Sequence, residues 1–142
     1  MNWRSIWAIL AGVLVAVVVT TLIDIALHIA GVFPPLKEPL TDGLALVASS
    51  YRTVIGIACA WLTARLAPRD PMRHAMILGG LGAVVALIGV VATWSLGLGP
   101  RWYPISLVVL ALPQSWAGGK LVERQTNASA SNEGGRPTRR SS

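Results

Sequence analysis

The chain has 142 residues, of which 54% are hydrophobic and only 13% are charged, whereas soluble domains carry about 25% charged residues. Its formal net charge is +6, but the basic residues lie mainly at the ends of long apolar blocks and in segment 123–142. This pattern suits anionic lipid headgroups and argues against a nucleic-acid-binding protein. Cys59 is the single cysteine, which excludes an internal disulfide and a metal site built on several cysteines.

Four apolar segments predict four transmembrane helices, at about 3–30, 43–66, 74–97 and 104–122. Each has roughly the 20 residues needed to cross ~30 Å of hydrocarbon, where the backbone must satisfy its own hydrogen bonds. We therefore expect an all-α membrane protein, with an up-down bundle of four transmembrane helices in residues 1–122. The first segment is longer than a signal-peptide core and lacks a clear cleavage site, so we interpret it as a retained helix.

The first segment contains a stripe that begins with small residues and ends with polar ones. Gly12, Ala16, Thr20, Asp24 and His28 follow one another at intervals of four residues, which places them on one face of a helix. Small side chains allow helices to approach closely. The stripe is therefore expected to face the bundle, with the carboxylate of Asp24 near its outer end.

The second segment offers Arg52 as a partner for Asp24. At a rise of ~1.5 Å per residue, Asp24 lies about 26 Å above the inner end of its span and Arg52 about 20 Å above Arg65. A lone charge at the bilayer centre costs about 2.5–3.5 kcal/mol, so the two groups are expected to pair. The candidate polar site comprises Asp24, His28, Arg52, Tyr51 and Trp94.

Two interpretations of this polar site remain open. It is either an ion pair that fixes helix register, or a proton- or ion-responsive site or outward-facing pocket for a small polar ligand. His28 by itself is interpreted as an interfacial residue, and no metal or cofactor is expected. Because the sequence shows no nucleophile with a base, no phosphate loop and no paired catalytic carboxylates, we expect a protein that is not an enzyme.

The third segment carries pairs of small residues at a spacing of four. Gly79 with Ala83 and Gly82 with Ala86 are typical of close helix packing, which we expect within the chain rather than between copies. The residues predicted to pack helices together are Gly12, Ala16, Gly56, Gly79, Gly82, Ala83 and Ala86.

The distribution of Lys and Arg predicts the orientation of the bundle. The predicted cytoplasmic side collects Arg4, Arg65, Arg69, Arg73, Lys120, Arg124, Arg136, Arg139 and Arg140, whereas Lys37 and Arg101 lie on the other side. The positive-inside rule then places both termini in the cytoplasm. Segment 123–142 is poor in apolar residues and rich in Ser, Gly and Arg, so it is predicted to be a disordered basic tail.

The motifs LHIAGVFPP, YRT, LTARLAP, PMRHA and GPRWYP resemble those of small, uncharacterised bacterial inner-membrane proteins with four helices. The resemblance covers about residues 6–120 and implies a multi-pass protein of the bacterial plasma membrane, with no established activity to carry over. We expect a non-enzymatic accessory or structural component whose partners are the lipid bilayer and either another membrane protein or a second copy. The alternative is a small transporter, or an ion- or proton-responsive protein, that uses Asp24, His28 and Arg52.

Overall fold

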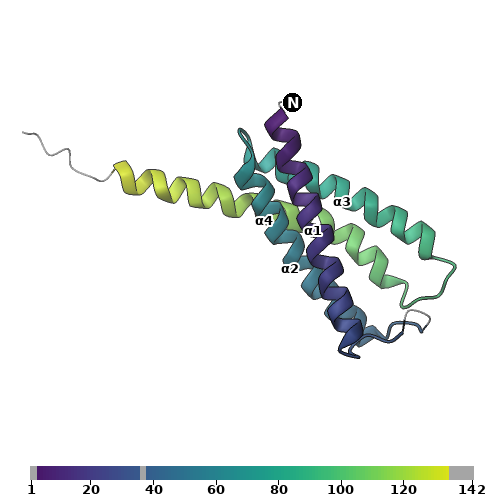
Figure 1. Cartoon of the computed structure of the whole chain (residues 1–142). Helices are drawn as coiled ribbons and strands as arrows, with labels where there is room; N and C mark the ends of the chain where they lie inside the picture. Colours follow the sequence, from purple (N-terminus) through teal and green to yellow (C-terminus); the bar gives the residue numbers. More distant parts are fainter. Residues whose placement is uncertain (1–2, 36–37, 135–142) are drawn as a thin grey trace, which may run out of the picture.

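The computed structural model describes residues 3–35 and 38–134. Within these ranges all regular structure is helical, as α1 (Trp3–Ile29), α2 (Asp42–Leu66), α3 (Pro71–Thr93) and α4 (Trp102–Gly134) (Figure 1). All four helices are long and apolar enough to cross a membrane. The predicted all-helical class and the number of spans are therefore confirmed, and the helices are those of a multi-pass membrane protein.

Turn residues explain where these helices begin and end. After α1, Gly31 adopts a positive φ of 70°, a conformation that glycine reaches without a steric penalty. Before α3, Asp70 has a φ of 50°, and Pro71 occupies the first turn, where a missing N–H costs no hydrogen bond. The turn between α2 and α3 is short, so these two helices run antiparallel.

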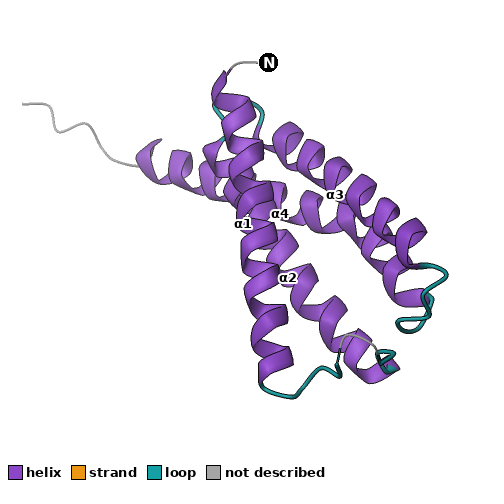
Figure 2. Cartoon of the chain, turned by 45° about the vertical axis from the view of Figure 1, so that its right-hand side comes forward, coloured by secondary structure: helices purple, strands orange, loops and turns teal. Residues whose placement is uncertain are grey.

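The helices do not pack evenly around a centre. The most extensive contacts join α4 to α2 and α3, while α1 lies against α2 and, over a smaller area, against α3. Figure 2 shows the α1–α2 hairpin diverging from the α3–α4 hairpin towards the end that holds their connecting loops. We call this the loop end. The opposite end, with Arg4, the α2–α3 turn and Lys120, is the basic end.

The predicted C-terminal ends of α3 and α4 differ most from the structure. Helix α3 ends at Thr93 rather than near residue 97, because Gly97 takes a positive φ of 60° in the turn that follows. Helix α4 continues to Gly134, so residues 123–134, for which the sequence predicted disorder, are helical in the structure. Residues 135–142 of the predicted tail lie outside the described residues.

The extension of α4 has a physical reason. Adding residues to an existing helix avoids the unfavourable nucleation step that a separate short helix would face. No proline follows Pro113 before residue 134. Thr126, Ser129 and Ser131 each donate a hydrogen bond to the carbonyl four residues earlier. The polar composition of this stretch therefore did not determine its backbone conformation.

Small residues form much of the buried core. Ala45, Ala60, Ala64 and Ala75 are at most 1% exposed, which lets the helix backbones approach closely. Glycines are used in the same way. A Cβ added at Gly12 would clash with Thr63, one at Gly56 with Gln114, and one at Gly79 would lie 2.5 Å from the hydroxyl oxygen of Ser115. Of the glycines predicted to pack helices, these three have packing roles within the chain.

Gly82 behaves differently from Gly79, although both were expected to pack within the chain. A Cβ added at Gly82 would meet no atom within 4 Å, and the residue is exposed. Ala83 and Ala86 on the same helix are half-buried. On α3, Gly79 thus packs closely against Ser115 of α4, whereas Gly82 makes no such close contact.

Candidate functional site

The Asp24 carboxylate of α1 is bound by two neighbouring residues of α2. Tyr51 donates its hydroxyl proton to Oδ1, and the Arg52 guanidinium Nη2 lies 2.5 Å from Oδ2. The side chains of Arg52 and Asp24 are 32% and 28% exposed. Each carboxylate oxygen therefore has its own donor, which is the arrangement that stabilises a charge away from bulk water.

His28 lies one helical turn from Asp24 but does not bind its carboxylate. Its Nδ1 donates to the backbone carbonyl of Asp24 at a distance of 2.8 Å. The imidazole ring packs edge-to-face against Phe33, with ring centroids 5.6 Å apart, and Phe33 is only 7% exposed. His28 thus joins the end of α1 to the following loop by packing against Phe33. The sequence did not predict this contact.

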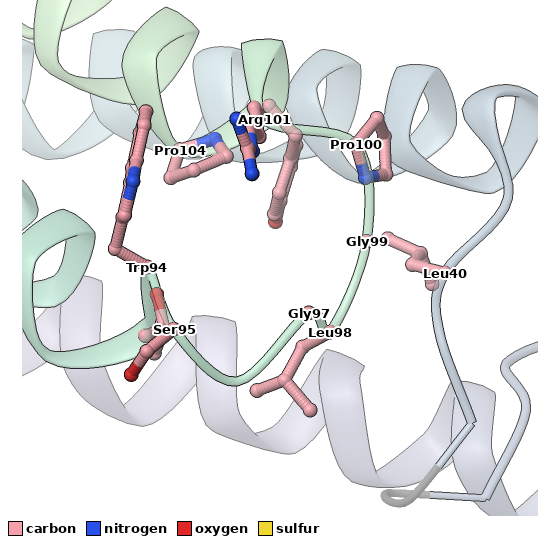
Figure 3. Close-up of a pocket in the computed structure, with 11 residues that line it drawn as sticks. Leu40, Trp94, Ser95, Gly97, Leu98, Gly99, Pro100, Arg101 and Pro104 are labelled. Atoms are coloured by element: carbon pink, nitrogen blue, oxygen red, sulfur yellow. The ribbon is translucent and has the colours of Figure 1, made fainter.

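Trp94 lines a neighbouring cavity and does not bind Asp24. The Arg101 guanidinium carbon lies 5.5 Å from the centroid of its ring. Both residues border a cavity of about 440 Å³ that is enclosed by the α3–α4 loop. Figure 3 shows the loop curving around this space, with Leu40 from the α1–α2 connection on its far side.

A second cavity, of about 480 Å³, lies among all four helices. Arg52 and Tyr103 line it together with small residues of α3 and Gln114 of α4. Thr93, Tyr103 and Pro104 border this interior cavity and also the loop-end cavity of Figure 3. The arginine that binds Asp24 therefore also faces an interior space adjoining the loop end.

Contacts between the two connecting loops hold the loop end together. The indole Nε1 of Trp102 donates to the Asp42 carboxylate at 2.7 Å, and the backbone N–H of Leu40 donates to the carbonyl of Leu98 at 2.8 Å. A charge and an indole at the starts of two helices are the only sequence signal for their pairing.

The site offers one carboxylate, one guanidinium and two phenols, and in the described residues no group of three metal-ligating side chains comes together. Asp24, Tyr51 and Arg52 satisfy one another. Cys59 is buried at 3% exposure in the hydrophobic core.

Comparison with protein-family models, with curated proteins and with solved structures finds no match for the chain.

Proposed function

We propose that the chain is a non-enzymatic accessory component of a bacterial inner membrane and that it binds a transmembrane helix of another membrane protein. The proposed orientation places both termini in the cytoplasm, because the basic end carries Arg4, Arg65, Arg69, Arg73 and Lys120. Reporter fusions at the two termini are expected to report the cytoplasm. A periplasmic signal from either terminus would contradict this orientation.

The observation that carries the proposal is a face of small residues on α3. Gly82, Ala86, Gly89 and Thr93 line the interior cavity at spacings of four, three and four residues, which is the spacing of one helix face. A Cβ added at Gly82 or at Gly89 would meet nothing within 4 Å. Small residues at such spacings let a further transmembrane helix approach closely.

The recessed position of this face favours a different protein over a second copy. A symmetric dimer must join the same patch on both subunits. Residues of all four helices border the cavity, so the α3 face is concave, and two concave faces do not complement each other. A partner that presents a protruding helix fits this shape better.

The experiment compares two glycines of α3. Gly82 lines the cavity, whereas Gly80 does not, and a Cβ at either position meets no atom within 4 Å. Gly82→Leu is expected to abolish co-purification of a stoichiometric partner from native membranes, and Gly80→Leu to preserve it. Benzoylphenylalanine at position 82 should crosslink to the same partner, and at position 80 should not.

Three results would overturn this proposal. The chain could purify alone from native membranes, both leucine variants could retain the partner equally, or crosslinks from position 82 could join two copies of the chain. The last result would assign the α3 face to self-association instead.

A second candidate function, a transporter or ion-responsive protein, is favoured by Arg52, which binds Asp24 and lines the interior cavity. A change of protonation or a bound ion at Asp24 would then alter the charge facing that cavity. Reconstituted protein should carry a pH-dependent flux that Asp24→Asn abolishes. Asp42→Asn, which changes a carboxylate outside both cavities, is the control. Absence of flux for protons and monovalent cations would contradict this candidate.

A further inference from the structure

A third cavity lies at the basic end, away from the Asp24 site. Its volume is about 280 Å³, and its polar lining consists of Ser5 from α1 and of Arg69, Asp70, Arg73 and His74 around the start of α3. Since a water molecule occupies about 30 Å³ in the liquid, the space exceeds that of a single small ion with its nearest waters. Nothing in the function proposed above uses it.

His74 is the most informative residue of this cavity. It is only 7% exposed, and its Nδ1 donates to the Asp70 carbonyl at 3.1 Å. Its Nε2 is buried and has no hydrogen-bond partner within residues 3–35 and 38–134. A polar atom buried without a partner is unfavourable, so His74 has an unsatisfied hydrogen-bonding atom beside this cavity.

The surrounding charges indicate an anionic ligand. Arg69 and Arg73 are exposed guanidinium groups on the cavity wall, opposed by the single carboxylate of Asp70. The first turn of α3, beginning at Pro71, adds the partial positive charge of a helix N-terminus. The sum of these charges is positive.

We propose that this cavity binds a phosphate group, held by the guanidinium groups of Arg69 and Arg73, with His74 at the cavity wall beside it. Guanidinium groups match the geometry of phosphate oxygens and bind them with two parallel hydrogen bonds. The group is either inorganic phosphate or the headgroup of an anionic phospholipid, since the basic end of a membrane-spanning bundle lies at headgroup level.

The experiment uses the His74 imidazole as a direct probe of binding. The chain has two histidines, so His28→Gln leaves His74 as the only one. Its imidazole NMR signals are followed in the full chain in a neutral detergent, first with inorganic phosphate and then with dihexanoylphosphatidylglycerol. A saturable shift with both probes, or with either probe alone, supports the site, and the pattern identifies the source of the phosphate.

Variants distinguish this site from general attraction to a basic surface. Arg69→Gln and Arg73→Gln are each expected to weaken binding about tenfold. Arg65→Gln is the matched control, because Arg65 lies at the same end but stacks over Trp61 at 5.1 Å, outside this cavity. The proposal is overturned if neither probe shifts the His74 signals, or if all three variants weaken binding equally.

Discussion

At the scale of single residues, Asp24 shows how a charge is held within an apolar helix. Tyr51 and Arg52 are adjacent in the chain, yet each binds a different oxygen of the same carboxylate. The sequence supported the pairing of Asp24 with Arg52 because both lie at similar depth and each would be costly alone. The sequence did not show that Tyr51, rather than Trp94, binds Asp24, because depth alone does not specify the direction of an aromatic side chain.

We expect Asp24→Ala and Arg52→Ala each to lower the free energy of unfolding by about 1–2 kcal/mol, because each leaves a partly buried charge without its partner. Tyr51→Phe should cost about 1 kcal/mol, the typical contribution of one hydrogen bond. The double exchange Asp24→Arg with Arg52→Asp should restore part of the loss. Unfolding in a denaturing detergent titration measures all four variants.

Lys120→Ala is the control for these variants. Lys120 and Glu123 form an exposed ion pair at 3.0 Å, and such pairs contribute little to stability. If Asp24→Ala and Arg52→Ala are as stable as Lys120→Ala, the interaction between α1 and α2 at this site does not stabilise the bundle.

At the scale of helices, close contact between α2 and α4 depends on a glycine that the sequence analysis did not select. A Cβ at Gly118 would lie 2.6 Å from the carbonyl oxygen of Ile57 and 2.7 Å from the Cβ of Ala60. Gly118 follows Ala117 directly and precedes Gly119, so no small-residue spacing distinguishes it. Gly118 faces α2 because of the rotation of α4 about its own axis, and helix periodicity alone does not determine that rotation.

Gly118→Ala should therefore force α2 and α4 apart and cost about 1–3 kcal/mol, as overpacking typically does. Gly80→Ala makes the same chemical change on α3, where the new methyl group meets nothing within 4 Å. It should leave stability unchanged or raise it slightly, because alanine favours helix more than glycine does. Equal stability of the two variants would show that the α2–α4 contact tolerates separation.

At the scale of the whole molecule, hydrophobic length predicted the number and order of the helices, because crossing a bilayer leaves the backbone little alternative to helix. The uneven packing was not predictable in the same way. Four similar apolar helices can associate in several arrangements, and contacts such as Trp102 with Asp42 join residues 60 positions apart. The glycines of α3 illustrate this. Gly79 and Gly82 each precede an alanine by four residues, yet an added Cβ would clash with a neighbouring helix only at Gly79.

The length of α4 has a consequence for whatever follows it. Its 33 residues extend about 50 Å at 1.5 Å per residue, whereas the hydrocarbon layer is ~30 Å thick. Figure 1 shows the helix projecting beyond the other three at the basic end. We call the last part of α4, which reaches beyond the ends of the other three helices, the spacer.

A spin label at Ser131 should accordingly show a single narrow distance distribution to a label at Arg65, measured by pulsed electron resonance. Asn127→Pro, which interrupts the spacer between these positions, should broaden that distribution. An equally broad distribution in the parent chain would show that the projecting segment is not stiff. With a stiff spacer, Ser131 would keep a constant distance from the end of α2 instead of folding back against the other three helices.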